Sequence, residues 1–265
     1  MPYGMAAAHL PSGLSVQIDR FHHDGLYLRS WRMSLRDSER AADRHDFVLV
    51  HGLGVSSRYF GRLAARLAEV GVVHLVDLPG FDGVPHPERP VEMTEFADLV
   101  EWWARSTGLE APVAVGHSMG AQIVVEAMAR NPGMAGHAVV VGPPVNRRER
   151  SAPRQVLRLL QASPHESSRM RRTALAGYLR SGPHWVTQVL PRMLAYPIEE
   201  RIADLTVPLL VIRGEHDAVA PREWCAELAA RAPDGTVAEI PGAGHGVILD
   251  HKDETADLVL AHARR

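Results

Sequence analysis

The stretch VAVGHSMGA, residues 113–121, contains the pattern Gly-x-Ser-x-Gly, with Ser118 between Gly116 and Gly120. A Val-rich run of strand length precedes the serine, and a helical pattern over residues 119–130 follows it. This strand–turn–helix context predicts a tight turn that lifts the Ser118 hydroxyl clear of a sheet, beside the positive end of a helix. We therefore predict that Ser118 is a nucleophile. The alternative is a glycine-rich helix start that the serine merely caps.

Short apolar runs alternate with longer helical patterns on both sides of this stretch. The predicted strands cover residues 14–21, 26–33, 46–51, 72–76, 112–116, 137–141, 207–212 and 236–240. The predicted helices of the same region cover residues 57–70, 94–107, 119–130, 223–231 and a final segment that ends near residue 263. Short Val-rich strands that are buried on both faces belong in a parallel sheet covered by helices. The alternation therefore predicts a doubly wound α/β fold.

The strand signal disappears between residues 143 and 205, where prolines separate three helical patterns over 152–162, 167–179 and 185–194. We predict a core formed by residues 1–142 and 206–265 and a helical cap over 143–205 that covers Ser118. Five apolar residues of the cap are candidates for lining a pocket, with packing onto the core as the alternative: Leu159, Leu175, Trp185, Val189 and Met193.

A serine hydroxyl needs a general base, and two loops near the C-terminus carry the candidate partners. PGAGHG, residues 241–246, is a glycine-rich loop after a predicted strand, and such a loop can place His245 over a site. RGEHDAVAP, residues 213–221, begins at the end of another strand and offers Glu215 and Asp217 as carboxylates that can orient an imidazole. Active sites of open parallel sheets gather at the carboxyl ends of the strands, where these residues are expected.

The segment HGLG, residues 51–54, directly follows a predicted buried strand. Its glycines can expose a backbone N–H, and we predict that the N–H groups of Leu53 and Met119 form an oxyanion hole. An ordinary tight turn is the alternative. His51 and His117 flank the glycine motifs, and we expect them to form supporting hydrogen bonds rather than to act as bases.

With these motifs in place, the chain resembles the α/β-hydrolase superfamily over nearly its full length. The matching segments are VLVHGLG (48–54), VDLPGFDG (76–83), VAVGHSMGA (113–121), VPLLVIRGEHDAVAP (207–221) and IPGAGHGV (240–247). The resemblance implies a mostly parallel eight-stranded sheet, with the helical cap between the sixth and seventh strands. It places the acid at Asp217 rather than Glu215, in the chain order Ser118, Asp217, His245. It also implies no metal and no organic cofactor.

This triad predicts a hydrolase that cleaves a carboxylic ester, thioester or lactone through an acyl-enzyme on Ser118. Haloalkane dehalogenases and epoxide hydrolases of the superfamily resemble the chain in layout but use an aspartate nucleophile, so Ser118 disfavours both. Two alternatives stay open. One is a C–C bond hydrolase for a diketone-like compound, and the other is a non-hydrolytic small-molecule receptor or cyclase on the same fold.

The composition limits the other classes of function. A formal net charge of -2 argues against nucleic-acid binding, and Cys225, as the single cysteine, excludes an internal disulfide framework. No apolar run is long enough for a transmembrane helix, and residues 1–10 lack the pattern of a secretory signal. We expect a cytoplasmic protein that acts on a small molecule without inserting into a membrane.

The charge of the cap differs from that of the whole chain. Residues 143–200 carry ten arginines against four glutamates, an excess of six positive charges. The arginines are Arg147, Arg148, Arg150, Arg154, Arg158, Arg169, Arg171, Arg172, Arg180 and Arg192. Because guanidinium groups suit carboxylates and phosphates, the excess predicts an anionic substrate or a negatively charged carrier of the substrate. A solvated surface in an arginine-rich chain is the alternative.

Overall fold

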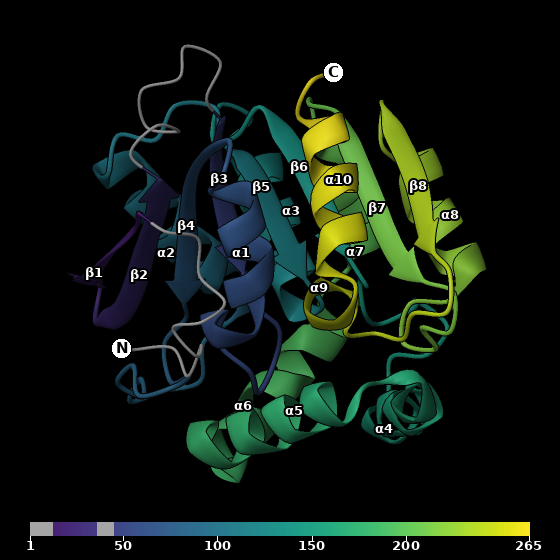
Figure 1. Cartoon of the computed structure of the whole chain (residues 1–265). Coiled ribbons are helices and arrows are strands. Elements are labelled where there is room, and N and C mark those ends of the chain that lie inside the picture. The colour runs from purple at the N-terminus through teal and green to yellow at the C-terminus, as the bar shows by residue number, and fades with distance from the viewer. Residues whose placement is uncertain (1–12, 36–44) are drawn as a thin grey trace.

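The computed structural model describes residues 13–35 and 45–265, and this part of the chain forms an eight-stranded sheet (Figure 1). The strands are β1 (Leu14–His23), β2 (Leu26–Leu35), β3 (His45–Val50), β4 (Gly71–Asp77), β5 (Val113–His117), β6 (His137–Val141), β7 (Leu209–Gly214) and β8 (Gly235–Ile240). Their order is β1-β2-β4-β3-β5-β6-β7-β8. The pairs β1–β2 and β2–β4 are antiparallel, and all the following pairs are parallel. The predicted doubly wound, mostly parallel sheet is confirmed.

Helices cover both faces of the sheet. In Figure 1, α1 (Gly61–Leu67) and α10 (Lys252–His262) lie in front of it, and α2 (Met93–Ser106), α3 (Met119–Arg130) and α8 (Arg222–Arg231) lie behind it. The strand side chains alternate between two apolar clusters: Val48 and Val50 of β3 face α2 and α3, whereas Phe47 and Leu49 face α1. Burial on both faces explains why the central strands are continuous apolar runs.

The carboxyl ends of β3 and β5 meet at the point where the strand order reverses. The two strands pair in parallel, with Val50 opposite Gly116. Residues 51–54 and the turn at Ser118 therefore emerge side by side at the same edge of the sheet. Crevices for ligands form at such switch points in open α/β sheets.

The segment between β6 and β7 is helical. It contains α4 (Ala152–Ala162), a short turn of 3-10 helix, η4 (Ser163–His165), α5 (Ser168–Ser181) and α6 (Pro183–Ala195), which lie beyond the carboxyl edge of the sheet (Figure 1). The last part, α7 (Ile198–Arg201) and η5 (Ile202–Asp204), packs instead on α3 and α8. The helices that stand over the carboxyl edge are therefore α4, α5 and α6.

Helix α6 holds this segment to the core. Trp185, Val189 and Met193 recur every four residues along α6, so they share one face, and that face is buried in the cluster that also contains Phe81. Trp185 and Val189, which were candidates for lining a pocket, therefore take the packing alternative. The Trp185 ring lies edge-on to Phe81, with 6.3 Å between the ring centroids.

Asp77, the last residue of β4, joins three elements through buried hydrogen bonds. Its Oδ2 atom accepts from Arg29 Nε and Trp31 Nε1 of β2, each at 2.8 Å. Its Oδ1 atom accepts from the backbone N–H of Ser57, also at 2.8 Å, at the start of the 3-10 helix η3 (Ser57–Phe60). The antiparallel β2 is thereby tied to the parallel part of the sheet.

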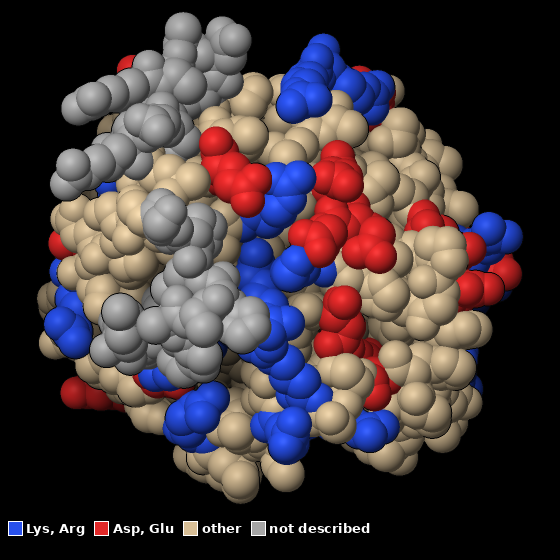
Figure 2. All heavy atoms as spheres, in the orientation of Figure 1, with Lys and Arg blue, Asp and Glu red and all other residues tan. Residues whose placement is uncertain are grey.

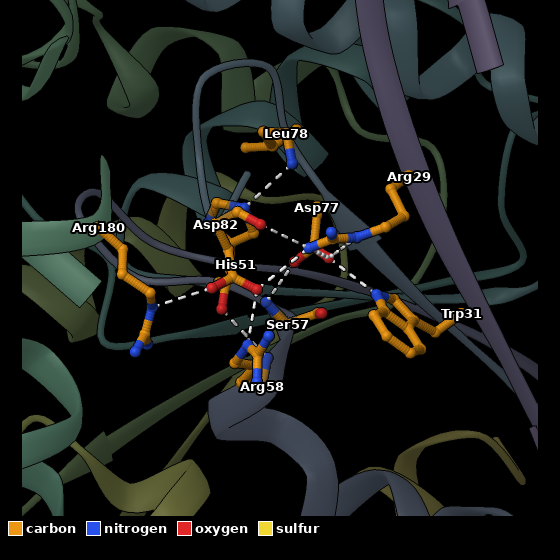
Figure 3. Close-up of polar contacts among 10 residues, drawn as sticks. Arg29, Trp31, His51, Ser57, Arg58, Asp77, Leu78, Asp82 and Arg180 are labelled. Atoms are coloured by element: carbon orange, nitrogen blue, oxygen red, sulfur yellow. Dashed lines mark hydrogen bonds and ion pairs between the residues drawn. The ribbon is translucent and has the colours of Figure 1, made fainter. Parts of the chain in front are cut away.

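Asp82 extends this network to α5. Its carboxylate pairs with Arg29 at 3.1 Å, with Arg58 at 2.6 Å and with Arg180 of α5 at 3.0 Å. Figure 3 shows the three guanidinium groups converging on this carboxylate from different sides. Arg180 thus anchors α5 to the core by an ion pair whose carboxylate is buried.

We expect Asp77→Asn to lower the free energy of unfolding by about 3 kcal/mol, because it removes one of the two buried carboxylates that pair with Arg29 and turns an amide NH₂ toward the donors that now contact Asp77. Urea denaturation followed by circular dichroism measures the change. The control is Asp98→Asn, because Asp98 forms an exposed pair with Arg130 at 2.6 Å and should cost less than about 1 kcal/mol. Equal losses in the two variants would contradict a structural role specific to Asp77.

Candidate active site

Ser118 lies in the tight turn that its sequence motif predicts. Its backbone has a φ of 53° and a ψ of -125°, a conformation that residues other than glycine rarely adopt. Helix α3 begins at the next residue. A Cβ atom at Gly116 would lie 2.3 Å from the carbonyl oxygen of Gly120, and one at Gly120 would lie 2.1 Å from that of Val50. Only glycine fits at both flanking positions, and the half-buried Ser118 side chain faces a cavity.

His245 and Asp217 form a buried pair beside Ser118. The loop after β8 carries His245, the loop after β7 carries Asp217, and 2.9 Å separates His245 Nδ1 from Asp217 Oδ2. The other carboxylate oxygen accepts from the backbone N–H groups of Val219 and Ala220 at 2.9 and 3.1 Å. His245 lines the same cavity as Ser118, so the structure brings all three predicted triad residues together.

The ionisation of the pair follows from its charges. Burial disfavours the imidazolium, but attraction to Asp217, the hydrogen bond between them and the nearby Glu166 together raise the pKa of His245 above its usual value. Burial also disfavours the Asp217 carboxylate, but attraction to His245 and the hydrogen bonds to it and to Ala220 hold the pKa of this carboxyl below its usual range. Asp217 is therefore ionised and stabilises a proton on His245.

Glu215, the competing carboxylate, lies outside this arrangement. Its side chain is exposed, and its Oε2 atom accepts from the backbone N–H of Gly242 at 2.8 Å. That contact braces the glycine-rich loop that leads to His245. The geometry therefore favours Asp217 over Glu215 as the acid.

The loop over residues 51–54 lies beside Ser118 and beneath α5. The backbone N–H of Gly52 donates to Tyr59 Oη at 2.9 Å, so it is not available to a ligand, whereas Leu53 lines the cavity. A Cβ atom at Gly177 of α5 would lie 2.4 Å from the carbonyl oxygen of Gly54. The glycine in mid-helix is explained by this close approach, which outweighs its poor helix propensity.

His117 connects this loop to the loop of His245. Tyr59 Oη lies 2.9 Å from His117 Nδ1, and His117 Nε2 lies 2.9 Å from the carbonyl oxygen of His245. Because Tyr59 Oη accepts from Gly52, its O–H donates to Nδ1, and the Nε2–H of His117 donates to His245. Burial and the neighbouring His245 lower the pKa of His117 to about 3, so this histidine is neutral and supports the site by hydrogen bonding.

His51 has a similar supporting position on the other side of the loop. Its Nδ1–H donates to the carbonyl oxygen of Gly52 at 2.8 Å, and its Nε2 accepts from the backbone N–H of Leu78 at 3.1 Å (Figure 3). Burial lowers the pKa of His51, which keeps it neutral for both contacts. Tyr59 is the supporting residue that sequence reasoning missed, because nothing distinguishes it from other residues of the predicted helix over 57–70.

Ser118 and His245 both line a cavity of about 500 Å³. Its walls are mainly apolar and come largely from α4, α5 and α6. The residues of these helices that line it include Val156, Leu159, Met170, Leu175, Tyr178, Val186, Leu190 and Met193. Of the five apolar candidates from the sequence, Leu159, Leu175 and Met193 therefore line the cavity. Within residues 13–35 and 45–265, no group of three His, Cys, Asp or Glu side chains is arranged to hold a metal ion.

Glu166 is a polar residue of this wall that the sequence did not single out. It lies between η4 and α5, and its Oε1 atom accepts from the backbone N–H of Gly246 at 2.9 Å. Its other oxygen is buried without a hydrogen-bond partner in the part of the chain that the structure describes, and burial raises the pKa of this carboxyl. Next to it, Ser167 Oγ donates to Asp250 at 2.6 Å, so this junction is attached directly to the segment after His245.

The comparisons with known proteins agree with this geometry. The sequence matches the family model described as "Alpha/beta hydrolase family" over residues 47–258. The chain belongs to the α/β-hydrolase family. The predicted superfamily resemblance is therefore confirmed.

Among curated proteins, this α/β-hydrolase is similar to the pimeloyl-[acyl-carrier protein] methyl ester esterase of Pectobacterium atrosepticum, with 27% identity over 84% of this chain and 96% of the relative. The enzyme of the same name from Chromobacterium violaceum is 28% identical over 82% of this chain and 93% of its own length. Among solved structures, a thermophilic esterase from Thermogutta terrifontis has a TM-score of 0.76 at 18% identity, over 94% of this chain and 98% of the esterase. That structural likeness shows the shared fold.

We expect Tyr59→Phe to reduce kcat of the hydrolase roughly tenfold with little change in KM, because it leaves the N–H of Gly52 and Nδ1 of His117 without partners. Steady-state kinetics on an ester separates the two parameters. The control is Tyr27→Phe, which removes an exposed hydroxyl on β2. A loss of stability in Tyr59→Phe with kcat unchanged would show that the tyrosine only supports the fold.

The raised pKa of His245 predicts the pH profile. Only the unprotonated imidazole can accept the serine proton, so kcat/KM should rise with pH and reach half its plateau above the usual histidine value of about 6.5. Glu166→Gln should shift the midpoint to lower pH, because it removes a negative charge that favours the imidazolium. The exposed Glu223→Gln is the matched control. A wild-type midpoint below 6.5, or one that Glu166→Gln leaves in place, would refute this electrostatic account.

Proposed function

We propose that the chain hydrolyses a carboxylic ester, thioester or lactone through an acyl-enzyme on Ser118. The observation that carries the proposal is the convergence of Ser118 and the His245–Asp217 pair on one apolar cavity. Esterase relatives that match more than four-fifths of the chain support the same reaction class. The mainly apolar wall suits an acyl group without charge near the ester.

In the first half of the reaction, His245 Nε2 accepts the proton of Ser118 Oγ while that oxygen attacks the carbonyl carbon. The negative charge then moves to the carbonyl oxygen, where the backbone N–H groups of Leu53 and Met119 stabilise it. Asp217 accepts the Nδ1–H of His245 throughout and balances the charge of the imidazolium. Collapse of the tetrahedral intermediate expels the alcohol, thiol or ring oxygen, which takes the proton from His245.

In the second half, a water molecule enters the place of the leaving group. His245 accepts one of its protons while the water oxygen attacks the acyl carbon, and Leu53 and Met119 stabilise the second oxyanion. The proton then returns to Ser118 Oγ as the acid leaves. In each half, His245 accepts one proton and then gives it up, so a single imidazole is sufficient. His117, whose pKa is lowered to about 3, takes no part in these transfers.

We further propose that residues 143–205 act as the cap predicted from the sequence, with α4, α5 and α6 shaping the acyl pocket. Their contribution to the cavity wall supports this role. Contacts that attach this segment to the core include Glu166 with Gly246, Arg180 with Asp82, and the buried face of α6.

The charge of the cap supports the expected preference for an anionic substrate or a negatively charged carrier. Five of its ten arginines form salt bridges with carboxylates: Arg147, Arg150, Arg158, Arg180 and Arg192. Arg150 is structural, because it pairs with Glu199 through both carboxylate oxygens at 2.7 and 2.8 Å. The other five form no salt bridge with any residue that the structure describes, and their charge is available to a partner: Arg148, Arg154, Arg169, Arg171 and Arg172.

No helix in the described ranges is long and apolar enough to span a membrane. A cytoplasmic location is proposed from the sequence and stays a prediction.

We expect Ser118→Ala to abolish ester turnover and labelling by a fluorophosphonate probe while the fold stays intact, since triad residues act as a unit. A panel of a neutral ester, an anionic ester, a phosphopantetheine-linked ester and a diketone measures the substrate class. Turnover of esters with none of the diketone supports the proposal. Turnover of the diketone alone would assign C–C bond hydrolysis, and binding without turnover would assign a receptor.

Asp217→Asn and Glu215→Gln form a matched pair within the same experiment. Asp217→Asn should cut kcat by about 10⁴-fold, by analogy with the corresponding change in a serine protease triad, with little effect on substrate binding. Glu215→Gln should stay near wild type, because its exposed carboxylate only braces the loop at Gly242. The reverse ranking would identify Glu215 as the acid.

A further inference from the structure

Helix α4 exposes its apolar face to solvent. Val156 and Leu160 lie on one side of the helix and are 52% and 64% exposed, with Leu157 beside them at 53%. The buried residues of α4 are instead Gln155 and the small Ala162, and Gln155, which is 5% exposed, donates to the backbone carbonyl of Glu149. A surface helix of a globular protein normally has the opposite arrangement, with its apolar stripe against the core.

Helix α5 continues this exposed apolar surface with Leu175 and Leu179, which are 62% and 67% exposed. We call the whole set the apolar rim; it consists of Val156, Leu157, Leu159, Leu160, Leu175 and Leu179. Outside α4 and α5, the large apolar side chains that are exposed in the described ranges are four, on β1, β8 and the start of β2. A concentration of exposed apolar side chains on two helices of the same cavity wall is typical of an interaction site.

Half of the rim also belongs to the wall of the cavity. Val156, Leu159 and Leu175 belong to the rim and also line the cavity that contains Ser118. Leu157, Leu160 and Leu179 belong to the rim but not to the cavity wall. Exposed apolar side chains of α4 and α5 therefore extend into the wall of the cavity that Ser118 lines.

Positive charge flanks the rim. Neither α4 nor α5 contains an aspartate or glutamate, and together they carry six arginines: Arg154, Arg158, Arg169, Arg171, Arg172 and Arg180. Arg158 pairs with Glu149 and Arg180 with Asp82, whereas the other four form no salt bridge with the residues described. Figure 2 shows Lys and Arg side chains running down the front of the molecule toward the end at which α5 lies in Figure 1.

We propose that the apolar rim and its unpaired arginines dock the enzyme on an anionic lipid surface, from which an ester with an acyl chain passes into the cavity. This inference rests on the proposed ester hydrolysis and names the negatively charged carrier as a lipid phase. Leucines on one face and arginines beside them are the pattern of helices that lie in a membrane interface. The acyl region accepts the leucines, and the anionic headgroups accept the guanidinium groups.

An acidic protein partner is the other source of negative charge. It would satisfy the arginines, but it would also have to cover six exposed aliphatic side chains and leave a path for the substrate. A lipid surface meets both demands with one partner, because the ester itself is dissolved in the phase that covers the rim.

Flotation of the inactive Ser118→Ala protein with vesicles tests the docking without turnover. We expect binding to vesicles of phosphatidylcholine mixed with phosphatidylglycerol, and little binding to phosphatidylcholine alone. Leu157→Ser with Leu160→Ser should weaken binding at least tenfold. Arg171→Gln with Arg172→Gln should weaken it roughly twentyfold and reduce its salt sensitivity.

Matched variants on another face control for nonspecific effects. Val16→Ser with Ile18→Ser changes exposed apolar residues of β1, and Arg264→Gln removes an exposed charge near the C-terminus. These variants should bind vesicles as the parent protein does. Absence of vesicle binding, or equal losses in rim and control variants, would overturn the proposal.

Two further measurements distinguish the lipid surface from a protein partner, and the docking from the proposed ester hydrolysis. Binding of an acidic acyl carrier protein by Ser118→Ala, without binding to vesicles, would replace the lipid surface by a protein partner. Turnover of a short water-soluble ester by the otherwise wild-type enzyme should be unchanged in Leu157→Ser with Leu160→Ser, because neither residue lines the cavity. Failure of all ester turnover while Ser118→Ala still binds vesicles would refute the proposed reaction and leave the docking surface in place.

Discussion

The backbone of Ser118 is held in a conformation with a φ of 53°, and the arrangement of the site depends on this one strained residue. The turn closes only because Gly120 can lie against the carbonyl oxygen of Val50 and Gly116 against that of Gly120. The same contacts bring the carboxyl ends of β3 and β5 together. Ser118 therefore emerges beside the loop over residues 51–54, and a larger residue at either glycine would move Ser118 and the loop apart.

A second constraint links the three loops of the site. His117 accepts from Tyr59 and donates to the carbonyl of His245 as a neutral imidazole, and burial lowers its pKa, whereas Asp217 and Glu166 raise the pKa of His245. The ring centroids of the two histidines are 4.8 Å apart, yet their environments move their pKa values in opposite directions. The Asp217 carboxylate is bonded directly to His245, whereas His117 is buried against neutral partners. Two adjacent histidines can therefore have different protonation behaviour, because one is next to a carboxylate and the other is not.

The sequence could predict what depends on local pattern. The central strands are continuous apolar runs, and the tight turn at Ser118 has its glycines in place, so the sheet and the position of this turn followed from nearby residues. The partners of Tyr59 and Glu166 could not be predicted, because each contact joins segments that are far apart in the chain. Trp185 is a similar case, because its helical pattern shows an apolar face but not which surface that face meets.

Helices α4, α5 and α6 are attached to the core unevenly, and this asymmetry bears on the cavity at Ser118. Helix α6 buries a full apolar face in the core, and α5 approaches the loop at Gly54 so closely that only glycine fits at position 177. Helix α4 has neither kind of anchor, and the largest part of its apolar surface faces outward. Displacing α4 would therefore cost less burial than displacing α5 or α6, so we expect the wall of the cavity to be least stable at α4, while Ser118, His245 and Asp217 are held by the core.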